Sequence, residues 1–174
     1  MKKLKLKWVI LFIIVVGVII FLLSRIKEKP FKQIELEKNN IITNNTDVTY
    51  YDTILHIGLN ELGIDSTYLI INSFEGATMG DFDLQAYILG NETQFMVYMK
   101  KSSRLKTIKF LSHELIHLKQ YHEGKLIMVD DSFVIWKGET LDGINIPYKQ
   151  RPWEIEAFDE QYDLYKKIKA KLYD

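Results

Sequence analysis

The stretch FLSHELIHLKQYHEG, residues 110–124, contains three of the four histidines in this 174-residue chain. Apolar residues recur through and before it at helical spacing, at Leu105, Ile108, Leu111, Leu115 and Leu118. On such a helix His113 and His117 are just over one turn apart, so both imidazoles project from one face and can share a metal ion. Glu114 lies about 100° further round, where it can take a proton from a water on that ion. This is the HExxH pattern.

A catalytic zinc ion usually has three protein ligands and one open position, so the pattern needs a third ligand. His122 is nine residues beyond His113, one residue short of the metzincin spacing, and Gln120 stands where that pattern has a glycine. A better candidate is a carboxylate in RPWEIEAF, residues 151–158. Glu154 and Glu156 there fall in the first turns of a helix, although acidic residues at that position also simply compensate the helix dipole.

The surrounding sequence predicts one α+β domain over residues 47–174. Strands are expected where apolar, β-branched or aromatic residues run between turn signals, and helices where the apolar residues recur every three or four positions. The expected order is a helix (47–62), three strands (67–73, 83–90 and 93–100), the histidine helix (from Ser102 or Ser103 to Gly124), two strands (125–129 and 132–136), a loop (137–151) and, after Pro152, a last helix (153–172).

A membrane anchor is expected near the N-terminus. Residues 8–24, WVILFIIVVGVIIFLLS, carry no charge and follow a basic flank, residues 1–7. As a helix they rise about 25 Å, slightly less than a hydrocarbon core of about 30 Å, and flanking lysines can reach the interface. The alternative is a cleavable signal peptide, but the following LLSRIKEKP lacks a small-x-small site. Residues 25–46 are polar and predict a linker.

The charges are distributed unevenly along the chain. Residues 1–46 carry nine Lys or Arg against three acids, a net charge of +6, and residues 47–174 carry fourteen against twenty, a net charge of −6. An acidic domain argues against nucleic acid as a partner.

Cysteine is absent, which excludes disulfides, a thiolate nucleophile, cysteine-bound metal and a lipobox anchor. Basic residues are about equally frequent on both sides of the apolar segment, and the terminal amine favours a domain outside the cytoplasm.

HELIH followed by EIEA, residues 154–157, resembles the gluzincin branch of zinc metallopeptidases. The resemblance implies Zn²⁺ held by His113, His117 and Glu154, the glutamate three before the alanine, with Glu156 as the alternative. Phe158 departs from the polar residue that usually follows the alanine, and Asp159 or Glu160 are candidates for its role. The wider text HELIHLKQ … WKG … RPWEIEAF is similar to small zincin-like proteins of bacteria and phages, which implies a bacterial cell membrane as the location.

The resemblance also implies a function, a zincin-like peptidase tethered to the membrane. Residues 93–100 would be the strand that pairs with an extended peptide substrate. Glu114 would be the general base, and Tyr148 is a candidate to stabilise the oxyanion. Two other hypotheses remain open at this point. The domain could bind zinc or a peptide without cleaving it, or it could be an anchored domain whose HExxH is coincidental.

Overall fold

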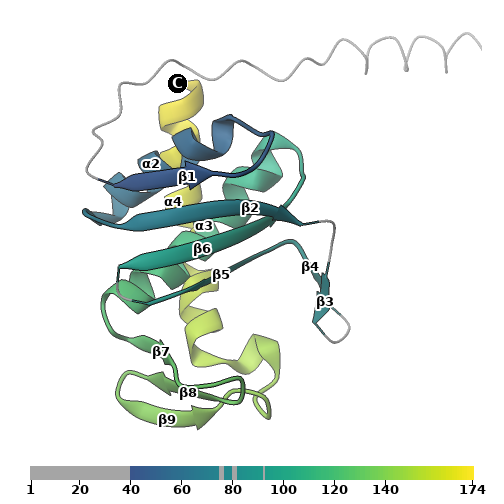
Figure 1. Ribbon diagram of the computed structural model, residues 1–174, viewed down its shortest axis with the longest axis vertical. Coiled ribbons are helices and arrows are strands. Elements are labelled where there is room, and N and C mark those ends of the chain that lie inside the picture. Colours follow the sequence, from purple (N-terminus) through teal and green to yellow (C-terminus); the bar gives the residue numbers. More distant parts are fainter. Residues whose placement is uncertain (1–39, 75–76, 80–81, 92) are drawn as a thin grey trace, which may run out of the picture. The chain divides into compact units, whose positions relative to one another are not determined.

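The computed structural model describes residues 40–74, 77–79, 82–91 and 93–174, which form an α+β domain (Figure 1). The predicted α+β class is therefore confirmed. The helices of this part of the chain are α2 (Tyr50–Leu62), α3 (Arg104–His122) and α4 (Pro152–Tyr173), with a 3-10 turn, η1 (Tyr148–Gln150), before α4. Its strands are β1 (Ile41–Asn44), β2 (Tyr68–Phe74), β3 (Ala77–Met79), β4 (Phe82–Leu84), β5 (Ala86–Gly90), β6 (Gln94–Lys100), β7 (Leu126–Met128), β8 (Phe133–Trp136) and β9 (Glu139–Asp142).

The main sheet has the strand order β1-β2-β6-β5. Strands β1, β2 and β6 are parallel, and β5 runs antiparallel to β6 at one edge. Every second side chain of β6, at Phe95, Val97 and Met99, is buried. This alternation is typical of a sheet with one face on the core, and in Figure 1 the three helices lie behind the sheet.

The prediction of which strand borders the cleft was wrong. Residues 93–100 were expected at the edge, but β6 pairs with β2 on one side and with β5 on the other. The edge strand is β5, which packs beside α3. The antiparallel pair itself was predicted correctly. Its local sequence does not say which of the two strands joins the rest of the sheet, because that depends on pairing with the distant β2.

Several short strands were also missed. β1 lies within residues 25–46, which had been assigned to the linker, and β9 lies in the predicted loop 137–151. Asn40 fixes the start of β1, since its side chain donates to the carbonyl of Ile64 at 2.8 Å and accepts from the N–H of Thr67 at 2.9 Å. Strands of three or four residues are stabilised by their partners rather than by their own sequence, so their sequence carries little signal.

The C-terminal ends of α2 and α3 agree with the turn signals, whereas α2 begins at Tyr50, three residues after the predicted start at Asp47. Gly63 ends α2 and Gly124 follows α3, each with a positive φ (66° and 65°), the left-handed conformation that glycine adopts without strain. Pro152 is the first residue of α4, as expected. One residue of the expected apolar face was misplaced, because Leu105 is 48% exposed in the first turn of α3.

The expected basic flank 1–7, anchor 8–24 and most of the linker lie outside the described residues. Within the described part of the chain, no helix combines the length and apolar character needed to cross a membrane. The anchor therefore stays a prediction.

Candidate metal centre

Two helices bring three potential metal ligands together. His113 and His117 project from α3, and Glu154 projects from the first turn of α4, which packs against α3. The Oε2 atom of Glu154 lies 3.2 Å from Nε2 of His113 and 3.4 Å from Nε2 of His117, and the two Nε2 atoms are 3.2 Å apart. All three side chains are buried. This group could hold a metal ion.

The spacing can be compared with what zinc requires. Tetrahedral zinc with bonds of about 2.0–2.1 Å to nitrogen and oxygen places its ligand atoms about 3.3–3.4 Å apart. The three observed separations lie between 3.2 and 3.4 Å. A hydrogen-bonded cluster of the same groups would have similar distances, so metal content rather than geometry distinguishes the two.

The electrostatics of the group favour an ionised glutamate between two imidazoles. Burial raises the pKa of Glu154, but hydrogen bonds from His113 and His117 outweigh it and lower that pKa to about 2. Burial lowers the pKa of His117, yet the hydrogen bond and charge of Glu154 raise it overall. A buried carboxylate charge therefore lies beside two imidazole nitrogens, and a bound cation would compensate this charge.

Glu114 faces the same cavity as these three residues. The cavity is small, about 100 Å³. It is lined by Ala86, Tyr87, Ile88, His113, Glu114, His117, Tyr121, Leu126, Met128, Tyr148, Trp153 and Glu154. Burial raises the pKa of the Glu114 carboxyl, while the charges of the two histidines and the backbone N–H of Ile88 act in the opposite direction. Glu114 thus faces the cavity without belonging to the group of three potential ligands.

Tyr148 reaches the cavity from η1, just before α4. Its hydroxyl hydrogen-bonds to Glu154, and both burial and the charge of Glu154 raise the pKa of the phenol. The sequence-based suggestion that Tyr148 stabilises an oxyanion is compatible with this position but is not tested by it.

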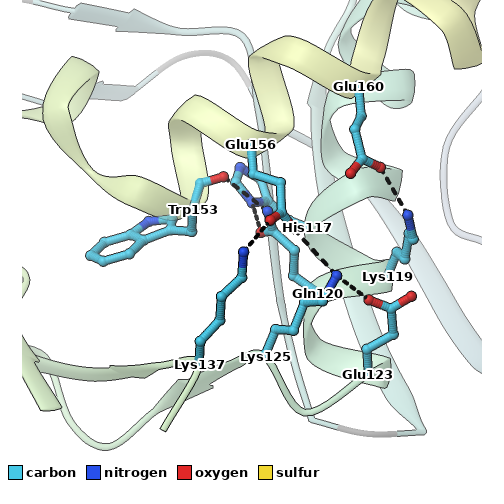
Figure 2. Close-up of polar contacts among 9 residues, drawn as sticks. All are labelled: His117, Lys119, Gln120, Glu123, Lys125, Lys137, Trp153, Glu156 and Glu160. Atoms are coloured by element: carbon cyan, nitrogen blue, oxygen red, sulfur yellow. Dashed lines mark hydrogen bonds and ion pairs between the residues drawn. The ribbon is translucent and has the colours of Figure 1, made fainter. Parts of the chain in front are cut away.

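The structure separates the other candidates from the imidazoles. Glu156 points to a different side of α4, where its Oε2 lies 2.6 Å from Nζ of Lys137 (Figure 2). His122 is exposed at the end of α3. Of the two suggested replacements for the residue at 158, Asp159 is exposed and Glu160 pairs with Lys119 at 2.8 Å. Neither carboxylate therefore reaches His113.

The two histidines are held in different ways. Nδ1 of His117 hydrogen-bonds to Oε1 of Gln120 at 2.8 Å. Nδ1 of His113 is buried and has no hydrogen-bond partner among the described residues. Instead the ring of Phe158 packs against His113, with centroids 4.6 Å apart. The aromatic residue that departs from the expected pattern thus occupies space beside this imidazole.

Two residues of the site were missed in the sequence. Gln120 had been noted only because it is not a glycine, and Tyr121 had not been considered. A signal was present for both, because Gln120 is three residues after His117 and Tyr121 is seven after Glu114, so each shares a helix face with a residue of the motif.

Comparisons with protein-family models, with curated proteins and with solved structures gave no match. The functional argument therefore depends on the residues of the site themselves.

Proposed function

We propose that this chain is a membrane-tethered, zinc-dependent peptidase with a zincin-like domain. The observation that carries the proposal is the convergence of His113, His117 and Glu154 at tetrahedral spacing, with Glu114 facing the same cavity. A coincidental HExxH would not require a buried carboxylate from a helix 41 positions away to meet both imidazoles.

The donor set favours zinc over other common ions. Two imidazoles and one carboxylate form the ligand set of many catalytic zinc sites, which keep one position open for water. Calcium and magnesium prefer oxygen ligands throughout. Several transition metals also bind imidazole, so the metal is to be identified by elemental analysis of protein purified without chelators.

The residues then have distinct roles. When bound, zinc lowers the pKa of its water and polarises the carbonyl that is attacked. Glu114 takes the proton of the attacking water and returns it to the leaving amine. Tyr148 donates its hydroxyl proton in a hydrogen bond to the oxygen on which negative charge develops, which requires it to leave its contact with Glu154.

An extended peptide is the substrate class that the cleft suits. The N–H of Lys100 donates to the carbonyl of Gln85, and the N–H of Asn91 donates to the carbonyl of Gln94. These two hydrogen-bonded pairs flank β5 and show which of its residues hydrogen-bond to β6. Because these pairs alternate along an antiparallel ladder, the N–H and C=O groups of Ala86, Ile88 and Gly90 point away from β6. The N–H of Ile88 bonds to Glu114, so an added strand would pair with Ala86, with Gly90 and with the carbonyl of Ile88. Ala86 and Ile88 also line the cavity of the metal group.

A second cavity continues along this edge and offers space for substrate side chains. It measures about 400 Å³ and shares Tyr121, Leu126 and Met128 with the first. Among the described residues its remaining lining is uncharged: Gly90, Asn91, Thr93 and Ile127. These residues favour a neutral substrate side chain in this cavity, because a charge would lose its hydration without gaining a partner among them.

A peptide-library cleavage screen on the full-length chain tests the proposal. The wild type should cleave, and Glu114→Gln should keep its zinc while losing about 10²–10⁴-fold in turnover. Glu123→Gln, an exposed glutamate just beyond α3, is the matched control and should cleave normally. Undiminished cleavage by Glu114→Gln would remove this residue from the mechanism, and zinc binding without any cleavage would favour the non-catalytic binding module.

A further inference from the structure

Gln120 connects the two helices that carry the metal group. Its side chain is buried, with 1% exposed. Oε1 accepts from Nδ1 of His117 at 2.8 Å, and Nε2 donates to the backbone carbonyl of Trp153 at 2.9 Å. Figure 2 shows both contacts, with the amide of Gln120 on α3 between His117 and the first turn of α4.

These two contacts fix the direction of the amide. The carbonyl of Trp153 can only accept a hydrogen bond, so the NH₂ group of Gln120 must face it. The amide oxygen is therefore the group that faces His117, and Nδ1 of His117 must carry the proton. With Nδ1 protonated, Nε2 is the nitrogen that can give its lone pair to a metal ion when the ion replaces the Nε2 proton, and Nε2 is the atom that faces His113 and Glu154.

The hydrogen bond from Gln120 to the carbonyl of Trp153 affects a second candidate ligand, Glu154. Trp153 directly precedes Glu154, so a hydrogen bond to its carbonyl holds the helical turn from which the Glu154 side chain departs. His113 has no comparable polar anchor among the described residues, since its Nδ1 lacks a hydrogen-bond partner there. The orientation of the group therefore depends strongly on Gln120.

We propose that Gln120 is a positioning residue that presets both His117 and Glu154 for one metal ion. The inference rests on the metal centre put forward under the proposed function, but not on peptide hydrolysis. Residues that hydrogen-bond the outer nitrogen of a ligating histidine affect metal affinity about 10–100-fold when they are replaced. A purely structural role would instead make Gln120 one of several polar links between α3 and α4.

The chain offers a matched control for that alternative. Lys119, the neighbouring residue, also links α3 to α4 through its 2.8 Å ion pair with Glu160, but it contacts none of the three candidate ligands. Lys119→Met and Gln120→Met each remove polar contacts between these helices. Only the second also removes the partner of His117.

The test measures zinc affinity by chelator competition on the full-length chain. Gln120→Met should bind zinc 10–100-fold more weakly than wild type, whereas Lys119→Met should change affinity less than about threefold, because its partly exposed ion pair touches none of the ligands. Nitrogen NMR of the metal-free proteins should show a hydrogen-bonded, slowly exchanging Nδ1 proton on His117 in wild type and in Lys119→Met, and a loss of this protection in Gln120→Met. Equal affinities of the two methionine variants, or unchanged protection of the Nδ1 proton in Gln120→Met, would overturn the inference.

A second variant separates the two contacts and covers a failure of Gln120→Met to fold. Gln120→Glu keeps an acceptor for His117 but cannot donate to Trp153. It should retain the hydrogen-bonded Nδ1 proton of His117 and bind zinc more tightly than Gln120→Met, or detectably where the methionine variant is unfolded. Loss of protection of this proton in Gln120→Glu would contradict the proposal. If wild type binds no zinc, the inference falls with the metal centre. If wild type binds zinc but cleaves no peptide, the peptidase proposal falls and the role of Gln120 stands.

Discussion

Glu154 and Glu156 are two residues apart in the first turns of α4, yet their surroundings are opposite in character. Two positions along a helix correspond to a rotation of about 200°. Glu154 therefore turns towards His113 and His117, while Glu156 turns towards Lys137 and, at 3.6 Å, Lys125. The local sequence EIEA offers both carboxylates, and the helix orientation selects one of them.

These two glutamates make a matched pair of variants. Glu154→Gln should weaken zinc binding by more than about a hundredfold, beyond the range expected for a residue outside the ligand set. Glu156→Gln should leave zinc affinity nearly unchanged, since it affects partly exposed ion pairs and a contact with Gln120 but none of the three candidate ligands. Chelator competition on both proteins provides the measurement, and the reverse ranking would transfer the ligand role to Glu156.

At this scale much of the candidate site was visible in the sequence. His113, Glu114 and His117 follow from the four-residue spacing on a helix, and Glu154 was named as a candidate. The contact of Phe158 with His113 was not foreseeable, because it depends on how α4 crosses α3. Gln120 was overlooked for a different reason, since a buried glutamine is informative only once its two partners are known.

Among the elements, α2 approaches α3 unusually closely at Gly58. A Cβ added there would lie 2.3 Å from Cδ1 of Leu115 and 3.2 Å from Cδ1 of Ile168. Both Leu115 and Ile168 are fully buried, so a shift of either side chain changes the packing of the core. The glycine thus permits the contact that supports α3 directly beside Glu114.

Gly58→Ala should therefore destabilise the domain even though alanine is the better helix former. The gain in helix propensity is about 1 kcal/mol, whereas overpacking a core typically costs about 1–3 kcal/mol. We expect a net loss of about 1 kcal/mol in the free energy of unfolding, measured by urea denaturation. Asn60→Ala, exposed on the same helix, should be neutral or slightly stabilising. A Gly58→Ala protein more stable than wild type would refute this account of the packing.

The ion pairs between α2 and α4 predict a pH dependence of stability. Glu61 lies 2.7 Å from Nζ of Lys171 and 3.6 Å from Nζ of Lys167. The hydrogen bond from Lys171 lowers the pKa of Glu61 in spite of partial burial. A carboxyl whose pKa is lower in the folded state stabilises the fold above its unfolded pKa, and this contribution is lost as the pH falls through the lowered value.

Glu61→Gln should accordingly reduce the free energy of unfolding by up to about 1 kcal/mol at pH 7. Wild type and variant should converge as the pH is lowered from about 4.5, the unfolded value, towards full protonation. Denaturation curves at a series of pH values provide the measurement. A difference that persists or grows at acidic pH would show that Glu61 acts through packing rather than through its charge.

Helices were predicted better than strands, because the signals for a helix lie within its own segment. Helices α2, α3 and α4 were predicted because caps, glycines and periodic apolar residues are contained within each segment. Two errors have one common cause: β6 was predicted at the sheet edge in place of β5, and β1 and β9 were not predicted. Strand order and short strands are set by partners elsewhere in the chain, which local patterns do not identify.

For the whole molecule, the central prediction is a membrane anchor over residues 8–24. Full-length protein should sediment with membranes and resist extraction by high salt and alkaline carbonate, because an apolar segment of this length is held by the hydrocarbon core rather than by charge. Deletion of residues 1–30 should release the protein into the soluble fraction. Extraction of the full-length chain by salt alone would contradict the anchor.

The most direct test of the account is the zinc content of the full-length chain, purified in mild detergent without chelators. We expect about one zinc per chain in wild type, as a single His-His-Glu group requires. His113→Ala and His117→Ala should each contain almost none, whereas His122→Ala should retain it. A wild-type protein with no bound zinc, even after dialysis against zinc, would contradict the metal centre and the peptidase proposal built upon it.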